Sequence, residues 1–163
     1  MNSVFGSLFI VSTPLGNLKD ITLRALNIMK NSYLIAAEDT RKSQILLNEY
    51  NIKTKMISYH EHNSHNRIKT IISYLKDGKN ISLISDAGTP GISDPSYRLI
   101  RTAIENEITV NSIPGPSAFL TALTSSGLPT DNFFFAGSLP PKKGRKSKLE
   151  ELSKLNSTLI LYE

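Results

Sequence analysis

The segment ISLISDAGTPGISDP, residues Ile81–Pro95, begins as an apolar strand and then changes character abruptly. Ile81–Ile84 has the composition of a buried strand, whereas the next eleven residues contain two glycines, two prolines and two aspartates. Glycine permits backbone conformations that other residues avoid, and proline removes a donor, so neither a strand nor a helix continues through this loop. In open α/β sheets, ligands bind where strands end in such loops.

Apolar patterns of the strand and helix types alternate along most of the remaining chain. Strands are predicted at residues 8–12, 33–37, 55–59, 81–85 and 108–113, and helices from about residue 22 and at 40–50, 63–76, 95–106 and 117–126. Asp20 or Thr22 is expected to cap the first helix, and Asp94 the helix that begins with Pro95. This alternation predicts the α/β class, with a parallel sheet covered by helices on both faces.

A second, shorter pattern follows the helix that ends at Gly127. It comprises a strand in DNFFFAG (131–137), a helix at 146–155 and a strand in STLILYE (157–163). One β-α-β unit is too small to bury both faces of its sheet alone. We therefore predict a first domain at residues 1–127 and the start of a second, truncated α/β domain at 128–163.

The composition restricts the kinds of protein that this chain can be. The 163 residues contain no cysteine, which excludes disulfides, thiolate nucleophiles and zinc–thiolate sites. No window approaches the ~20 apolar residues of a membrane span, and the N-terminal segment has neither the charge nor the apolar run of a signal peptide. A cytoplasmic protein that does not associate with membranes is expected.

Positive charge is concentrated in one segment. Residues 142–154 contribute +4 of the formal net charge of +5, through Lys142, Lys143, Arg145, Lys146, Lys148 and Lys154 against Glu150 and Glu151. A basic patch beside a nearly neutral body suggests a polyanion such as RNA. A solvated helix in a lysine-rich protein is the alternative that charge alone leaves open.

Three predicted strand ends are rich in glycine and proline: STPLGN (12–17), SDAGTPGISDP (85–95) and IPGPSA (113–118). Each could be a tight turn, but three of them at equivalent ends predict a ligand site walled by bare backbone. Neither a dinucleotide fingerprint nor a P-loop motif occurs. The carboxylate of Asp86 would repel phosphate and suits a hydroxyl or a positive charge instead.

Two further clusters have both a structural and a functional interpretation. In AAEDTR (36–41), Asp39 or Thr40 can cap a helix, and Arg41 can contact phosphate. The histidines of YHEHNSH (59–65) do not have the spacing of a known zinc motif, so we expect no metal. Ser117 follows PGP and lacks the G-x-S-x-G context of a hydrolase nucleophile.

The ordered set STPLGNLKDIT, IAAEDTR, SLISDAGTPGISDP, IPGPSA and GLPTDNFFFAGSLPPKKGRK resembles the ribosomal RNA small subunit methyltransferase I family. That family belongs to the tetrapyrrole (corrin/porphyrin) methylase superfamily. The resemblance runs from about Ser7 to Glu163, and family members continue well beyond that point. It implies a two-domain α/β methylase fold, S-adenosylmethionine as cofactor, and 2′-O-methylation of a cytidine in the decoding region of 16S rRNA.

The resemblance also implies roles for particular residues. The cofactor loops of the family correspond to Pro14, Asp86, Gly88, Thr89, Ser117 and Ala118, whereas Arg41, Lys142, Lys143 and Arg145 would contact the RNA of the small ribosomal subunit. Members of the superfamily generally act as homodimers, which implies a homodimer for the full-length protein.

Some functional assignments stay open at this point. Glu38, Asp39 and His60 could each act as the base that removes the ribose proton. A same-fold enzyme that methylates a tetrapyrrole or a protein residue is one alternative, although the basic PPKKGRK loop argues against it. A truncated remnant that binds RNA or a partner without catalysis is the other.

Overall fold

The computed structural model describes residues 4–163, which form two compact units. The first ends at Pro116 and the second begins at Ser117, so the helix after IPGP belongs to the second unit. The predicted domain boundary after Gly127 stays a prediction. The boundary between the two compact units lies eleven residues earlier in the chain, after Pro116.

The first unit is a five-stranded, all-parallel sheet with strand order β3-β2-β4-β1-β5. Its elements are β1 (Leu8–Val11), α1 (Leu23–Asn31), β2 (Leu34–Ala37), α2 (Thr40–Glu49), β3 (Met56–Ser58), α3 (Ser64–Lys76), β4 (Ile81–Ile84), α4 (Ser96–Glu105) and β5 (Val110–Ile113). The α/β prediction is confirmed, and the predicted elements are present with ends that differ by one or a few residues. Because β4 lies between β1 and β2, the loop after β4 starts in the middle of the sheet.

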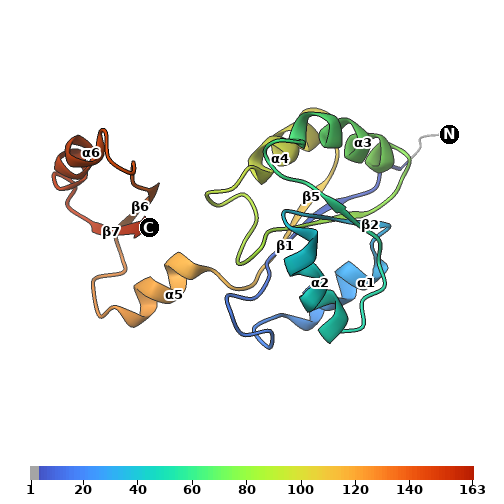
Figure 1. The fold of residues 1–163 in the computed structure, drawn as a ribbon, viewed down its shortest axis with the longest axis horizontal. Coiled ribbons are helices and arrows are strands. Elements are labelled where there is room, and N and C mark those ends of the chain that lie inside the picture. The colour runs from blue at the N-terminus through green and yellow to red at the C-terminus, as the bar shows by residue number, and fades with distance from the viewer. Residues whose placement is uncertain (1–3) are drawn as a thin grey trace. The chain divides into compact units, whose positions relative to one another are not determined.

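Both faces of the sheet are buried, which explains the continuous apolar runs of the central strands. Successive residues point to opposite faces: Leu34 packs with α3 and α4, and Ile35 packs with α1 and α2. Leu83 and Ile84 divide in the same way. Figure 1 shows the helix pairs α3–α4 and α1–α2 on the two sides of the strands.

Side chains at the helix ends agree with the caps that the sequence suggests. Thr22 accepts a hydrogen bond from the Ala25 amide at 3.0 Å, so Thr22 and not Asp20 caps α1. Asp94 accepts from the Ser96 amide at 2.7 Å, although α4 itself begins one residue later than predicted. Capping satisfies amides that have no partner within the helix.

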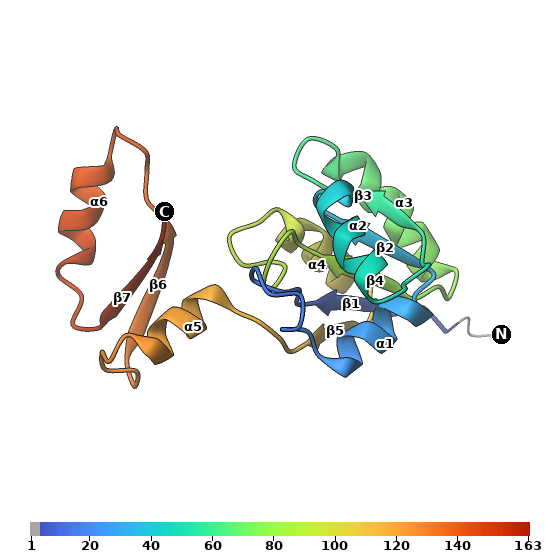
Figure 2. The same ribbon diagram turned by 60° about the horizontal axis from the view of Figure 1, so that its bottom comes forward.

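The second unit contains α5 (Ala118–Ser125), β6 (Phe133–Ser138), α6 (Arg145–Leu152) and β7 (Thr158–Tyr162). β6 and β7 pair in parallel, and Figure 2 shows α6 alongside this two-stranded sheet. The Phe119 and Phe135 rings stack with centroids 5.0 Å apart, and Tyr162 meets Phe135 edge-on at 4.8 Å. These ring contacts join the start of α5 to both strands of the small sheet.

No helix in the described range, residues 4–163, has the length and apolar character needed to cross a membrane.

The packing of α4 gives a stability prediction. Leu99 is fully buried in the cluster beneath α3 and α4, so Leu99→Ala should lower the free energy of unfolding by about 2–5 kcal/mol. Ile104 lies on the same helix with 60% of its surface exposed, and Ile104→Ala should change it by less than about 0.5 kcal/mol. Urea denaturation followed by far-ultraviolet circular dichroism measures both. Equal effects of the two substitutions would contradict the assigned packing of α4.

Candidate functional site

Three loops leave adjacent strands at the carboxyl edge of the first unit's sheet. They follow β1, β2 and β4, which are neighbours in the order β2-β4-β1. Because all the strands are parallel, Ser12–Asn17, Glu38–Asp39 and Ser85–Pro95 begin at the same edge. The topology therefore brings two of the three glycine- and proline-rich loops that the sequence singles out to the same edge as the AAEDTR segment.

A backbone bridge fastens the loop after β1 to the loop after β4. Thr13 and Gly88 exchange two N–H···O hydrogen bonds, each 2.9 Å long. The Thr13 hydroxyl also donates to the Ser85 carbonyl at 3.1 Å. Gly88 has φ +79°, and a Cβ there would lie 3.2 Å from the Leu15 side chain. The Gly88 amide donates to the Thr13 carbonyl and is therefore not available to a ligand. The role of Gly88 is to shape the loop.

Hydroxyl groups extend this connection to the loop after β5. The Ser12 and Thr89 hydroxyl oxygens lie 2.9 Å apart, and Thr89 donates to the Pro116 carbonyl at 3.1 Å. Ser12 is buried and its hydroxyl also lies 3.3 Å from the Ile113 carbonyl. A Cβ on Gly115 would be 2.7 Å from the Ser12 Cβ, a distance that requires something to shift. Thr89 is thus a fixed part of the loop framework.

Asp86 is the charged centre of this edge. Its Oδ1 accepts from the Asp39 amide at 2.9 Å, and its Oδ2 accepts from the Lys42 ammonium at 2.6 Å. The hydrogen bond with Asp86 raises the pKa of Lys42. The Asp86 amide in turn lies 3.4 Å from Glu38 Oε2. An acid suited to a positive group was expected here, and the structure places an ammonium of the chain itself on it.

The acids of EDTR have different environments. Burial raises the pKa of Glu38, and the nearby Asp86 carboxylate acts in the same direction. Hydrogen bonds from Arg41 lower the pKa of Asp39 to about 2. Asp39 also caps α2 by accepting from the Arg41 amide at 2.9 Å. The Arg41 guanidinium lies on Asp39 at 2.9 Å with its side chain 90% exposed, so a structural role accounts for it in this conformation.

A hollow of about 190 Å³ lies among these loops. Pro14 and Asp86 line it together with Lys42, Ser43 and Leu46 of α2. Ser43 is buried, and within residues 4–163 its hydroxyl has no hydrogen-bond partner. The structure thus brings two of the predicted cofactor residues, Pro14 and Asp86, to one hollow. Gly88 and Thr89 lie two and three residues beyond Asp86 in the same loop.

The remaining predicted residues belong to the second unit. Ser117 and Ala118 follow Pro116 directly, and the Ser117 carbonyl accepts from the Thr121 amide at 2.9 Å at the start of α5. Lys142 and Lys143 are exposed ahead of α6. Arg145 is the first residue of α6 and forms an ion pair with Glu163. Lys142 and Arg145 also line a hollow of about 610 Å³ beside Leu149.

His60 is held by its neighbours. The His60 Nε2 atom lies 3.1 Å from the Asn63 side-chain nitrogen, and the His60 amide donates to Asn63 Oδ1 at 3.0 Å. The Asn63 amide NH₂ group can only donate, so this contact is a hydrogen bond only in the tautomer that carries its proton on Nδ1. That Nδ1 is buried without a partner among the described residues. Across residues 4–163, no three His, Asp or Glu side chains are grouped to hold a metal ion.

Three residues of this edge were missed by the sequence reasoning: Ser12, Lys42 and Ser43. Lys42 and Ser43 directly follow EDTR, at the first turns of a helix whose cap was predicted. A helix that starts at a strand's carboxyl end brings its first residues close to the neighbouring loop. This placement is the signal that could have identified Lys42 as a partner of Asp86.

The family model for Tetrapyrrole (Corrin/Porphyrin) Methylases matches residues 7–163. This chain belongs to that family. Among curated members, "Ribosomal RNA small subunit methyltransferase I" of Halalkalibacterium halodurans is 51% identical over 97% of this chain and 55% of its own length. The Escherichia coli O157:H7 protein of the same name is 48% identical over 97% of this chain and 56% of its own length. The chain therefore spans a little over half the length of these relatives.

Two solved structures show the same fold at low sequence identity. A diphthine synthase superposes with a TM-score of 0.77 and 14% identity, over 96% of this chain and 64% of that one. A uroporphyrin-III-C-methyltransferase from Thermus thermophilus gives 0.61 and 16%, over 82% of this chain and 59% of that one. At such identities the likeness supports the methylase fold alone.

The half-buried Glu38 gives a pH-dependent prediction. A raised pKa means that the folded state keeps the proton to a higher pH, so the free energy of unfolding falls as pH rises above the ordinary value of 4.5. Glu38→Gln removes this penalty and should gain stability relative to the parent chain at pH 7 more than at pH 4. Urea midpoints at the two pH values measure the difference, with Glu49→Gln on the exposed side of α2 as control. A larger gain at pH 4 would contradict this environment for Glu38.

Proposed function

We propose that the protein containing this chain transfers a methyl group from S-adenosylmethionine to the 2′ oxygen of a cytidine in 16S rRNA. The observation that carries the proposal is the identity of 47–51% with several proteins named ribosomal RNA small subunit methyltransferase I, over 96–100% of this chain. Its partner would be the small ribosomal subunit, and its place of action the cytoplasm. A homodimer stays a prediction for the full-length protein.

The residues at the sheet edge fit part of the methyl donor. S-adenosylmethionine supplies an electrophilic methyl group on a sulfonium and also carries an ammonium group and ribose hydroxyls. The Asp86 carboxylate would bind the ammonium or a hydroxyl, and Pro14 and the Thr13–Gly88 bridge would form a rigid wall beside it. The hollow of about 190 Å³ is smaller than the ~300–1,000 Å³ of typical ligand pockets. Residues elsewhere, Ser117 and Ala118 included, would hold the remainder.

The acids at this edge differ in their fitness as a base. Methyl transfer to a ribose hydroxyl forms an O–C bond, breaks the C–S bond and releases the hydroxyl proton, which a carboxylate can accept. Asp39 has a pKa of about 2 and is held by Arg41, so it is a weak base. Glu38, whose pKa burial raises, is closer to the range in which a base works near neutral pH. We therefore favour Glu38 over Asp39 for this role.

The RNA contact is assigned to the basic segment before and within α6. Lys142 and Lys143 are exposed and have no acidic partner within 4 Å among the described residues. Arg145 is partly neutralised by Glu163, so its contribution to phosphate binding would be smaller. Lysines in such a segment bind phosphates without reading sequence.

Calorimetric titration of S-adenosylmethionine into the purified chain tests the donor site. Asp86→Asn should weaken binding about tenfold or more, because a hydrogen bond to a charged group contributes ~1.5–3 kcal/mol. Asp77→Asn is the matched control, since Asp77 lies exposed at the end of α3. Equal affinities of the Asp86 and Asp77 variants would refute the role of Asp86. Absence of any binding would count against a donor site in this part of the protein.

The salt dependence of RNA binding tests the basic segment. Replacing Lys142 and Lys143 together by glutamine should reduce the slope of log K against log salt by about two, uniformly across RNA sequences. The control replaces Lys53 and Lys55, an exposed pair of lysines that precedes β3. Fluorescence anisotropy of a labelled RNA at several salt concentrations gives the slopes. An equal effect of the two double variants would show only nonspecific dependence on charge.

A further inference from the structure

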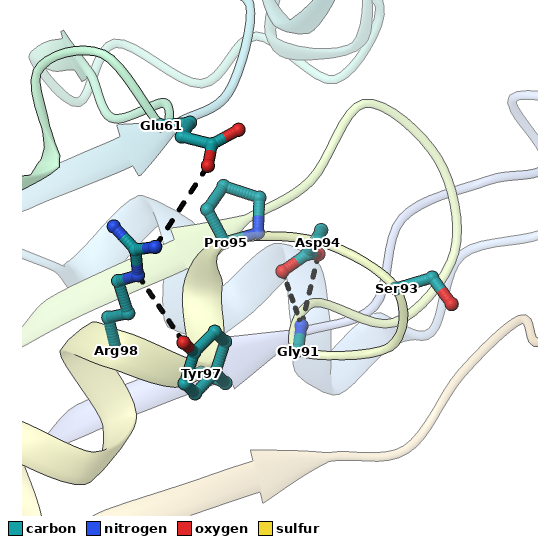
Figure 3. A pocket seen from close by; sticks show the side chains of 7 residues that line it. All are labelled: Glu61, Gly91, Ser93, Asp94, Pro95, Tyr97 and Arg98. Carbon is teal, nitrogen blue, oxygen red and sulfur yellow. Dashed lines mark hydrogen bonds and ion pairs between the residues drawn. The ribbon is translucent and has the colours of Figure 1, made fainter. Parts of the chain in front are cut away.

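A second hollow, of about 450 Å³, lies at the carboxyl edge of the first unit. It is formed by the far end of the loop after β4, the first turn of α4 and Glu61 in the segment after β3, as Figure 3 shows. Its lining includes Glu61, Gly91, Ser93, Asp94, Tyr97 and Arg98. None of these residues has a role in the proposed donor site.

The loop that forms one wall of this hollow is fixed by its own hydrogen bonds. Both Asp94 carboxylate oxygens accept from the Gly91 amide, at 2.9 and 3.0 Å, and Oδ1 also accepts from the Ser96 amide. Gly91 has φ +90° and Ser93 has φ +59°, so the backbone turns sharply at two residues in the left-handed region. Asp94 is occupied by the backbone amides of Gly91 and Ser96 and does not pair with Arg98. The side chains of Tyr97 and Arg98 can therefore contact a ligand.

Tyr97 and Arg98 are exposed and only loosely engaged. Tyr97 has 54% of its surface exposed, and 47% of the Arg98 side chain is accessible. The contacts of Arg98 are long, with Nε 3.4 Å from the Tyr97 hydroxyl and Nη2 3.9 Å from Glu61 Oε1. Exposed ion pairs of this kind contribute only ~0–1 kcal/mol. A ligand can therefore displace them at small cost.

The chemistry of this hollow matches an unpaired nucleotide. An exposed aromatic ring offers a surface on which a base stacks, and a guanidinium binds phosphate. The Glu61 carboxylate can accept from an exocyclic amine such as that of cytosine. Inorganic phosphate alone is a poor match, because Glu61 and Asp94 are two carboxylates beside a single arginine.

One loop connects the two hollows of this edge. Ser85–Ala87 at its start line the hollow that contains Pro14 and Lys42, and Gly91–Pro95 at its end line the hollow that contains Tyr97. We infer that the Tyr97 hollow binds an unpaired nucleotide of the RNA substrate, with its base stacked on Tyr97 and its phosphate on Arg98. This inference rests on the proposed function, because it assigns an RNA subsite next to the proposed donor site.

The chain contains no tryptophan, so Tyr97→Trp introduces a single fluorescent reporter into this hollow. Single-stranded hexacytidylate should quench this tryptophan, and cytidine 5′-monophosphate should do so at higher concentration. Inorganic phosphate should not. Tyr33→Trp is the matched control, because Tyr33 is 49% exposed and lies just before β2, at the opposite edge of the sheet. Quenching at position 97 but not at 33 supports the subsite; equal quenching, none, or quenching by phosphate overturns it.

Affinity measurements separate stacking from charge. By anisotropy, Tyr97→Ala should weaken hexacytidylate binding about 5- to 150-fold with an unchanged salt slope, since one base stacked on an aromatic ring contributes ~1–3 kcal/mol. Tyr97→Phe keeps the ring and should bind within about twofold of the parent chain. Unchanged affinity of Tyr97→Ala, or no RNA binding by the parent chain, would overturn the subsite. Neither assay contains methyl donor, so failure of the donor titration and failure of this inference are separate results.

Discussion

Parallel pairing of β2, β4 and β1 is the constraint on which the rest of the first unit depends. These strands are buried on both faces, so their residues must be apolar or, like Ser82, hydrogen-bonded, and few of them are free to carry chemistry. The polar and flexible residues collect instead in the loops at the strand ends. Parallel direction then places three of those loops at one edge. Thr13 and Ser12 join the loop after β1 to Gly88 and Thr89 of the loop after β4, and Asp86 of that loop accepts from the Asp39 amide after β2.

At this edge of the sheet, the backbone fixes the shape of the loops and the side chains supply the charge. Backbone bonds and buried hydroxyls give the loops a fixed shape, and the glycines stand where a Cβ would collide or where φ is positive. Charged side chains then join the loops to the helices. Asp86, in the loop after β4, binds the Asp39 amide and the Lys42 ammonium at the start of α2. The same loop leads at its far end into α4, whose first turn carries Tyr97 and Arg98, so one segment borders two hollows of different chemistry.

Much of the fold could be predicted from sequence because its signals are local. The Thr22 cap, the apolar strand runs and the glycine–proline loops each depend on a few adjacent residues. The pairing of Asp86 with Lys42 and of Ser12 with Thr89 depends on strand order, which local patterns do not specify. Arg41 shows the limit most clearly, since its charge suggested phosphate while its nearest acid lies two residues earlier in the chain. The Tyr97 hollow joins segments 30 residues apart and had no local signal either.

The contact between Lys42 and Asp86 has a consequence for the strength of ligand binding. A cationic group that arrives at Asp86 exchanges with an ammonium already present, so the number of opposite-charge contacts at the carboxylate does not increase. Lys42 has 66% of its side chain exposed and can move into water with a gain in rotamer freedom. Displacing Lys42 therefore offsets part of the new contact, which places the net contribution of Asp86 at the lower end of the ~1.5–3 kcal/mol of a hydrogen bond to a charged group. Tight and selective binding must come from shape complementarity and from apolar contacts with the rest of the ligand. Residues in the additional length of the relatives can supply some of these contacts.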